Sequence, residues 1–296
     1  MAEVLTELSS ALAGAVSRAA GGVARVEARE RFPASGIVWS KDGVVVTANH
    51  VVERDDELRV GVGEDSLPAV LVGRDPATDI AVLRVEGADF EPLVWADAAQ
   101  LEVGHITLAL GRPGRTVRAT MGIASAIGGA WRSHAGGRLE RYLQADVAMH
   151  PGFSGGPLID ATGAALGMNT SALRRMASPT VPAGDVKRVT EALLADGKVR
   201  RGYLGITPQP ARLPGALAEQ LGQDTGLLIT LVEPGSPADK GQLLLGDVIV
   251  RIDDTPVRQL DDLFSALADR PGESAQVQAV RGGQVQTFAL TIGERG

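Results

Sequence analysis

Short apolar runs separated by Gly, Asp and Asn fill most of the chain between residues 35 and 168. Such runs predict β-strands, because about four to eight apolar, often β-branched residues bounded by turn formers are typical of strands. No long helical pattern separates the runs, which favours an all-β barrel or sandwich. The expected strands lie at residues 36–39, 44–47, 58–62, 69–72, 80–85 and 106–110.

After residue 168 the pattern changes. Val186, Val189 and Leu193 recur at helical spacing and predict a helix that ends at Gly197. A short basic segment follows at residues 198–202, and we place the domain boundary there. Beyond it, further strands and one helix predict a separate small β-rich domain. The chain thus divides into an N-terminal helix or arm (residues 1–30), a larger β domain (31–198) and a second domain (199–296).

The first thirty residues predict one amphipathic helix, because Leu5, Leu8, Leu12 and Val16 recur at spacings of three and four. Acidic residues precede the first basic one, whereas a secretory signal begins with positive charge, so we expect no signal peptide. No apolar run approaches the roughly 18 residues that cross a bilayer. The apolar stripe either packs on its own domain or contacts another subunit.

Composition narrows the chemistry. None of the 296 residues is cysteine, which excludes disulfides, thiolate zinc sites and cysteine nucleophiles. A formal net charge of −7 with 3 % aromatic residues argues against nucleic acid as the main partner. The four histidines show no spacing typical of a metal site, so we expect neither a metal nor a cofactor.

A serine framed by glycines is the strongest chemical signal. Residues 152–157 are Gly-Phe-Ser-Gly-Gly-Pro, and glycines allow successive N–H groups to point at one spot beside Ser154. The string also fits the Gly-x-Ser-x-Gly turn of α/β hydrolases. However, all four histidines precede Ser154, whereas that fold places its histidine after the serine. A subtilisin-like set of Asp79, His105 and Ser154 would need a doubly wound α/β pattern, which the chain lacks.

The chain order His, Asp, Ser is met by His50, Asp79 and Ser154. Singly, such a histidine is more often a core residue and such an aspartate a turn former, but the ordered set is more telling. Ser154 would attack the peptide carbonyl, His50 would take and return the proton, and Asp79 would fix the imidazole tautomer. The segment Gly152, Phe153, Ser154 would form the oxyanion hole through the N–H groups of Gly152 and Ser154.

Together these motifs resemble the HtrA (Deg) family of trypsin-like serine proteases. The resemblance implies a mainly β fold, with a chymotrypsin-like double β-barrel protease domain whose active site lies in the cleft between the barrels. His50 and Asp79 would come from the first barrel and Ser154 from the second. The matching segments are residues 35–37, 42–43, 47–52, 78–83, 144–146, 152–158 and 163–169.

The C-terminal part resembles the PDZ domain of the same family. Its loop at residues 203–206 would offer N–H groups to the C-terminal carboxylate of a peptide, and the adjoining strand would pair with that peptide. The leucines of the predicted helix suit the groove wall, although core packing explains them equally well. We expect Gly205→Val to abolish peptide binding and to leave the fold intact. The expected groove residues are Tyr203, Leu204, Gly205, Ile206, Leu263 and Leu267.

One residue departs from the family pattern. The family usually has a polar residue, often Asn, directly before the nucleophile, where this chain has Phe153. Because an apolar ring makes no hydrogen bond, we expect the Gly152 peptide of the resting protein to point away until substrate or a partner corrects it. Loss of one oxyanion donor costs on the order of 10²- to 10³-fold in rate.

Two further segments bear on specificity. Trypsin-type pockets that take Lys or Arg have an acid about six residues before the serine, where this chain has Ala148. We therefore expect an S1 pocket at Ala148 that takes small or medium apolar residues, and we expect His150 only to line a loop. Residues 112–141 carry six arginines against one acidic residue, which predicts a solvated face or a loop that binds an acidic neighbour.

The leading interpretation is a serine endopeptidase that cleaves unfolded or damaged proteins, with a PDZ domain that binds C-terminal peptides and regulates activity. The alternative is a catalytically silent chaperone or PDZ-type binding protein. The resemblance also implies a trimer-based homo-oligomer. It suggests a periplasmic or extracytoplasmic location and leaves the cytoplasm open.

Overall fold

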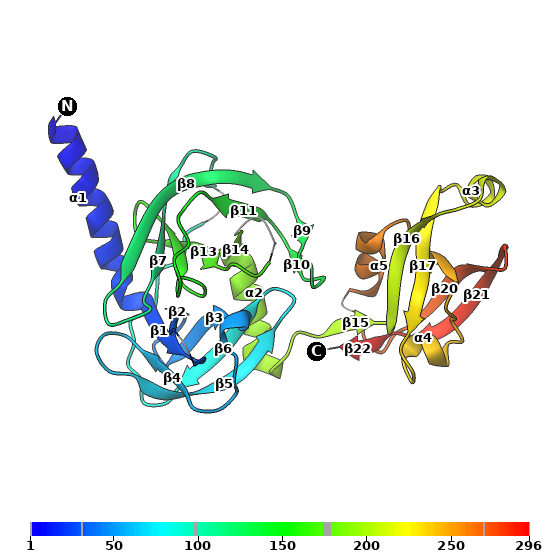
Figure 1. Ribbon diagram of the computed structural model, residues 1–296, viewed down its shortest axis with the longest axis horizontal. Helices are drawn as coiled ribbons and strands as arrows, with labels where there is room; N and C mark the ends of the chain where they lie inside the picture. The colour runs from blue at the N-terminus through cyan, green and yellow to red at the C-terminus, as the bar shows by residue number, and fades with distance from the viewer. Residues whose placement is uncertain (1, 31, 98–99, 174–178, 269, 296) are drawn as a thin grey trace. The chain divides into compact units, whose positions relative to one another are not determined.

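The structure is a computed structural model in which the chain forms two compact units. Unit 1 ends at Val199 and unit 2 begins at Arg200 (Figure 1). Each unit has its own apolar core. The structure describes residues 2–30, 32–97, 100–173, 179–268 and 270–295.

The first half of unit 1 is a closed six-stranded barrel with the strand order β1-β2-β3-β6-β5-β4. Strands β2 and β3 are buried along their whole length, including their polar residues Ser35 and Thr47, which explains why their sequences do not alternate between apolar and polar positions. The strands are β1 (Val23–Glu27), β2 (Ala34–Val38), β3 (Val44–Ala48), β4 (Leu58–Gly61), β5 (Leu67–Asp75) and β6 (Ile80–Val85).

The second half of unit 1 is a six-stranded sheet with the order β11-β8-β7-β12-β13-β14. An isolated bridge between Gln144 and Pro179 joins its two edges, so this sheet also curls into a barrel. The mainly β, double-barrel fold is confirmed. The strands are β7 (Ile106–Gly111), β8 (Arg118–Gly128), β11 (Tyr142–Ala145), β12 (Pro157–Asp160), β13 (Ala165–Asn169) and β14 (Thr180–Pro182), and β9 (Trp131–Arg132) with β10 (Arg138–Leu139) forms a small hairpin beside them.

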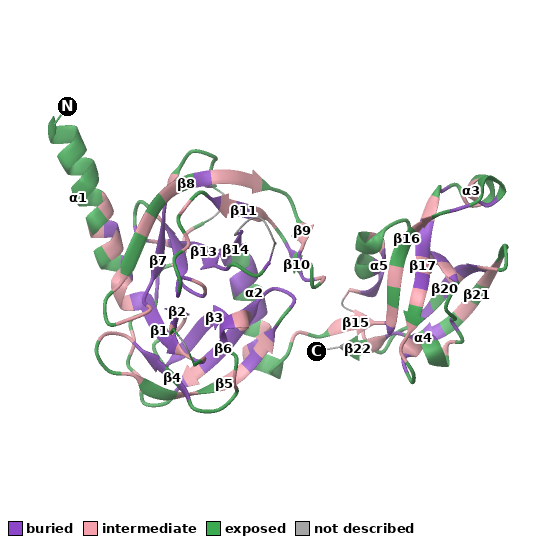
Figure 2. Ribbon diagram, viewed as in Figure 1, coloured by how far each residue is buried: buried purple, intermediate pink, exposed green. Residues whose placement is uncertain are grey.

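Two helices accompany the barrels. Helix α2 (Ala183–Asp196) buries Val186, Val189 and Leu193 and ends at Gly197 in the left-handed region, as its sequence predicts. Helix α1 (Ala2–Ala19) packs only through its second half, whereas its first ten residues are exposed wherever they are described (Figure 2). None of the described helices is long and apolar enough to cross a membrane.

Unit 2 has a six-stranded sheet, ordered β16-β17-β18-β20-β21 with β19 paired to β18, together with a two-stranded sheet, β15-β22, and three short helices. Helix α5 contacts the edge strand β16, and its Leu263 and Leu267 are buried in the core of the unit. The elements are β15 (Arg201–Tyr203), β16 (Ile206–Arg212), α3 (Gly215–Leu221), β17 (Thr225–Val232), α4 (Pro237–Lys240), β18 (Val248–Ile252), β19 (Thr255–Pro256), α5 (Leu260–Leu267), β20 (Ser274–Arg281), β21 (Gln284–Thr291) and β22 (Gly293–Arg295).

Gly205 is required by the fold of unit 2 itself. Its φ is +79°, and a Cβ atom at this position would lie 2.2 Å from the Cβ of Ser236. A side chain at position 205 would therefore collide with a buried neighbour and strain the backbone. This geometry argues against the expectation that Gly205→Val leaves the fold intact.

Candidate active site

His50 and Asp79 meet because the strands that carry them pair. His50 lies in a short turn after β3, and Asp79 directly precedes β6, with Ala48 opposite Ile80 in the ladder. One carboxylate oxygen of Asp79 accepts the backbone N–H of His50 at 2.9 Å, and the other lies 2.8 Å from the Nδ1 atom of the ring. Asp79 is 2 % exposed. The structure thus brings together two of the three expected catalytic residues.

The carboxylate of Asp79 accepts a further hydrogen bond, from a residue that was not predicted from the sequence. Thr170, at the end of β13 in the second half of unit 1, donates its hydroxyl hydrogen bond to Oδ2 of Asp79. Asp79 is an acceptor only, so the ring of His50 must donate through Nδ1–H. The Nε2 atom then carries the lone pair and can accept a proton.

In the described part of the chain, the hydroxyl of Ser154 makes no hydrogen bond to His50. Its Oγ lies 3.3 Å from the Oγ of Ser171, and that hydroxyl lies 3.5 Å from Nε2 of His50. Among the described residues, Ser171 is therefore the only hydrogen-bonding link between Ser154 and the imidazole. The three expected residues share one site, in which the hydroxyl of Ser171 lies within hydrogen-bonding distance of both the nucleophile and the base.

The turn before Ser154 has the geometry that an oxyanion hole needs. The N–H of Phe153 donates to the carbonyl of His150 at 3.0 Å, and Gly152, the third residue of this turn, has a φ of +89°. With Pro151 at the second position, this is a type II turn. In the described part of the chain, the N–H groups of Gly152 and Ser154 donate to no protein acceptor. The turn gives no sign of the internal bond that a misdirected Gly152 amide would make.

Phe153 occupies the core of the second barrel. The residue is fully buried, in one cluster with Leu143 and Leu158, and its ring packs edge-on against His150 with the ring centres 5.6 Å apart. The side chain therefore points away from the nucleophile. Its contribution to the turn is apolar packing.

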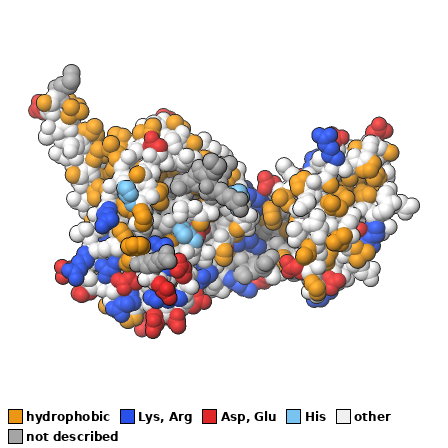
Figure 3. All heavy atoms as spheres, in the orientation of Figure 1, with side chains coloured by type: hydrophobic (Ala, Val, Ile, Leu, Met, Phe, Trp, Pro, Cys, Tyr) orange, Lys and Arg blue, Asp and Glu red, His pale blue; other side chains and the backbone are white. Residues whose placement is uncertain are grey.

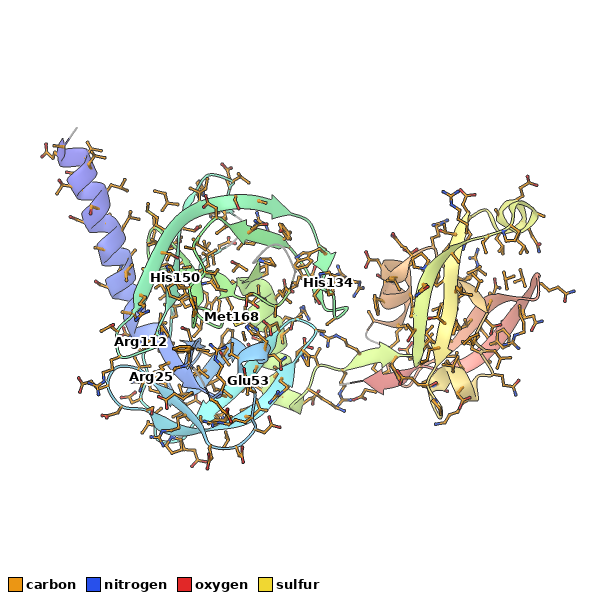
Figure 4. All side chains as sticks on the ribbon, in the orientation of Figure 1. Arg25, Glu53, Arg112, His134, His150 and Met168 are labelled. Carbon is orange, nitrogen blue, oxygen red and sulfur yellow. The ribbon has the colours of Figure 1, made fainter. Side chains whose placement is uncertain are left out.

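A cavity of about 690 Å³ lies beside His50, Ser154 and Ser171. His150 lines this cavity, whereas the described lining does not include Ala148, which is exposed and accepts a hydrogen bond from Thr120 through its carbonyl. Figure 4 labels two of the lining residues, Glu53 and His150. The full described lining is Arg29, Glu30, Phe32, His50, Glu53, Met149, His150, Pro151, Gly152, Ser154 and Ser171.

Among the described residues, no three His, Asp or Glu side chains lie close enough together to bind one metal ion. The cavity lining also carries Glu30, Glu53 and His150, and the bonded acid–base pair near Ser154 is His50 with Asp79. The arrangement suits proton transfer from a hydroxyl to an imidazole.

The second expected site lies in the loop between β15 and β16. The carbonyls of Leu204 and Gly205 accept hydrogen bonds from Ala238 and Glu233 at 2.8 Å, and Tyr203 donates to the carboxylate of Glu233. No acceptor for the N–H groups of Leu204 and Gly205 occurs among the described residues. The loop is therefore held through its carbonyls and presents free amides next to an edge strand, as binding of a peptide carboxylate requires.

Two family models match the chain: a trypsin-like peptidase domain over residues 34–168 and a PDZ domain over residues 202–292. The chain is 38 % identical over 269 residues to the "Probable periplasmic serine endoprotease DegP-like" of Ectopseudomonas mendocina (strain ymp), covering 88 % of this chain and 56 % of that protein. A protein of the same name from Chlamydia muridarum (strain MoPn / Nigg) is 34 % identical over 276 residues, covering 90 % and 55 %. The chain thus spans little more than half the length of these curated relatives.

Solved structures match over nearly their whole length. The structure described as "HtrA-type protease AlgW with tripeptide" is 33 % identical, with a TM-score of 0.75 and coverage of 96 % of this chain and 97 % of that one. The serine endoprotease from Yersinia pestis is 28 % identical, with a TM-score of 0.77 and coverage of 96 % and 98 %. Both units of this chain are therefore similar to those of known proteases.

Proposed function

Because the chain belongs to the HtrA family of trypsin-like serine proteases, we propose that it is a serine endopeptidase with Ser154 as nucleophile, His50 as base and Asp79 as the orienting acid. The observation that carries the proposal is the doubly bonded His50–Asp79 pair, at 2.8 and 2.9 Å, whose imidazole lines the same cavity as Ser154. Such a pair holds the imidazole with Nε2 ready to accept a proton.

In the proposed reaction the hydroxyl of Ser154 turns from Ser171 to Nε2 of His50 and attacks the carbonyl of the scissile peptide. The proton moves to Nε2, and Asp79 stabilises the imidazolium without taking the proton itself. The N–H groups of Gly152 and Ser154 bind the oxyanion of the tetrahedral intermediate. His50 then protonates the leaving amine, and water hydrolyses the acyl-enzyme.

The substrates proposed are unfolded or damaged proteins, cleaved after small or medium apolar residues. Met149 and Phe32 supply apolar surface to the cavity, which supports an apolar specificity. Unit 2 would bind peptide C-termini at the free amides of Leu204 and Gly205 and regulate the protease. Solved relatives described with a decapeptide and a tripeptide support this role for peptides. The names of the curated relatives support a periplasmic location.

A homo-oligomer built on trimers is proposed as the assembly. The exposed half of α1 carries Val4, Leu5 and Leu8, which are 64 %, 63 % and 44 % exposed, and the space-filling view shows apolar surface along this helix (Figure 3). A second copy would cover this surface. Light scattering of Leu5→Glu/Leu8→Glu should show a smaller mass than the unchanged chain, and an equal mass would place the contact elsewhere.

A second candidate function is a chaperone or binding protein with a silent protease site. The observation in its favour is that the described hydrogen bonds connect Ser154 to Ser171 and not to His50. A Ser154 hydroxyl that does not reach His50 would leave a protein that binds peptides but does not cleave them.

Covalent labelling by a fluorophosphonate separates the two functions. The unchanged chain should be labelled and should cleave unfolded casein, whereas Ser154→Ala should do neither. Binding of an apolar C-terminal peptide, measured by titration on both proteins, should be equal and shows that the variant is folded. An unchanged chain that binds peptide but neither labels nor cleaves would establish the silent site.

A further inference from the structure

Ser35, at the start of the first-barrel strand β2, touches the turn of the nucleophile twice. Its hydroxyl lies 2.6 Å from the carbonyl oxygen of Gly152, and its backbone N–H donates to the carbonyl of Ser154 at 3.2 Å. Ser35 itself is fully buried. One residue of the first barrel thus binds the carbonyls of both residues whose N–H groups form the proposed oxyanion hole.

The direction of the hydroxyl hydrogen bond follows from its neighbours. The backbone N–H of Arg112 donates to Oγ of Ser35 at 2.7 Å. An amide can only donate and a carbonyl can only accept, so the hydrogen of the Ser35 hydroxyl must point to Gly152. Two consecutive hydrogen bonds therefore link the amide of Arg112, the hydroxyl of Ser35 and the carbonyl of Gly152.

Arg112 is itself firmly anchored. It is 7 % exposed, unlike the solvated arginine face expected for residues 112–141, and Figure 4 labels it near the place where α1 runs into β1. Its guanidinium donates to the carbonyls of Val23 at 2.6 Å and of Ala20 and Arg115 at 2.7 Å. Burial and the nearby Arg25 lower its pKa, but an arginine stays charged. The bond to Val23 holds Arg112, whose backbone N–H donates to Ser35, against β1 of the first barrel.

The peptide between Gly152 and Phe153 is bonded at both ends as a result. Its carbonyl accepts from Ser35, and its N–H donates to the carbonyl of His150 at 3.0 Å. These two bonds hold the last peptide of the type II turn, in which Gly152 has a φ of +89°, in a fixed position beside Ser154. Phe153 supplies no polar group here.

We propose that Ser35 is the positioning residue of the oxyanion-hole turn, which it holds through its hydroxyl. The inference rests on the proposed role of Ser154 as nucleophile. Ser35 acts through Gly152 and does not touch substrate. Its loss should weaken transition-state binding while leaving substrate binding and the His50–Asp79 pair in place.

The test compares Ser35→Ala with Ser133→Ala in the full chain. Ser133 is a matched control, because its buried hydroxyl also accepts from an amide, that of Gly137 at 3.1 Å, and donates to a carbonyl, that of Ala77 at 2.5 Å. On a peptide substrate, Ser35→Ala should lower kcat about tenfold to a hundredfold with KM within about twofold. The pH midpoint of the reaction should not move. Ser133→Ala should lose similar thermal stability and keep its kcat.

A kcat of folded Ser35→Ala within about twofold of the unchanged chain would overturn the inference while leaving the proposed function intact. If Ser35→Ala does not fold, Ser35→Cys decides, because a thiol fills the space but donates weakly. Its kcat should fall at least about fivefold, and an unchanged value overturns the inference.

A measurement that does not depend on catalysis tests the inference even if the unchanged chain has no protease activity. NMR couplings of the Gly152 amide report its φ. They should show the positive φ in the unchanged chain and in Ser133→Ala, and a mixture of conformations in Ser35→Ala or Ser35→Cys. Identical couplings in all of these proteins would overturn the inference, whereas a silent but correctly coupled unchanged chain would overturn only the proposed function.

Discussion

The two halves of unit 1 hold their shares of the site in different ways. In the first barrel, His50 and Asp79 are bonded to each other at 2.8 and 2.9 Å through the pairing of β3 with β6. In the second half, Ser154 lies on a turn whose carbonyls are bonded to Ser35 of the first barrel. The acid–base pair is therefore a property of one barrel, whereas the placement of the nucleophile is a property of the contact between two.

This difference predicts two kinds of damage. A change inside the first barrel's pair should remove proton transfer, whatever the position of the nucleophile. A change at the contact of Ser35 with the turn should leave the pair intact and reduce the rate by misplacing the nucleophile or its oxyanion donors. Variants of single polar groups can separate the two.

The largest effect should come from Asp79→Asn. Asn tolerates the left-handed φ of +59° found at this position, so the fold should be retained. The amide cannot fix the Nδ1–H tautomer of His50, and kcat should fall on the order of 10⁴-fold. Steady-state cleavage of a peptide, with circular dichroism to monitor the fold, measures this. A loss of less than about tenfold would show that the pair is not the acid–base centre.

Thr170→Val should have the next largest effect, because it cuts the bond from the second half to Asp79. A hydrogen bond to a charged group contributes about 1.5–3 kcal/mol, and loss of roughly half of that in the transition state should lower kcat about fourfold to twelvefold. Thr190→Val is the matched control, since the buried hydroxyl of Thr190 has no described partner. Equal rates for both variants would mean that the cross-barrel bond is not needed.

Ser171→Ala should change the rate in the opposite direction. Its hydroxyl is the only described hydrogen-bond partner of the Ser154 hydroxyl, and removing a competing hydrogen bond of about 0.5–1.5 kcal/mol should speed fluorophosphonate labelling about twofold to tenfold. Rapid-mixing labelling kinetics measure this. Slower labelling would instead make Ser171 a helper of the proton transfer.

The smallest effect concerns a bond that lies away from the site. Burial raises the pKa of Asp185 in α2, while hydrogen bonds from Arg188 and from the backbone of Glu140 oppose the rise. Arg188→Met should therefore raise the pKa of Asp185 further, as carbon NMR titration would show. Because the charged pair exists only above the folded pKa, the loss of unfolding free energy should be larger at neutral pH and should shrink as pH falls through that pKa.

Lys187→Met is the control for this prediction, because the ion pair that Lys187 forms with a described residue, Glu191, is exposed and 4.0 Å long. Its effect on the free energy of unfolding should be small at every pH. A pKa of Asp185 that falls in Arg188→Met would contradict the prediction.

Site residues were easiest to predict from the sequence where a single strand determines the position of the residue. His50 and Asp79 could be found from the strands that they end and begin, and the strands around them were predicted because their apolar runs are continuous. Strand β8 was not predicted, because most of its residues are exposed or half-buried and its Gly, Ala and Ser side chains give no clear alternation.

The hydroxyls around the site were not predictable from the sequence. The roles of Ser35, Thr170 and Ser171 arise only when the two halves of unit 1 meet, since each contacts a residue far away along the chain. Arg112 shows the same limit, because a run rich in arginine predicts a solvated face while the fold buries this member among carbonyls.

The left-handed backbone at Asp79 also bears on how such a protein can change in evolution. Glycine and asparagine suit a φ of +59°, and neither supplies a carboxylate. Glutamate keeps the charge, but its longer chain does not share the tolerance of aspartate for this backbone. Replacements at this position that preserve the fold therefore remove the acid. A single mutation could turn a protease of this architecture into a stable binding protein whose second unit still captures peptides.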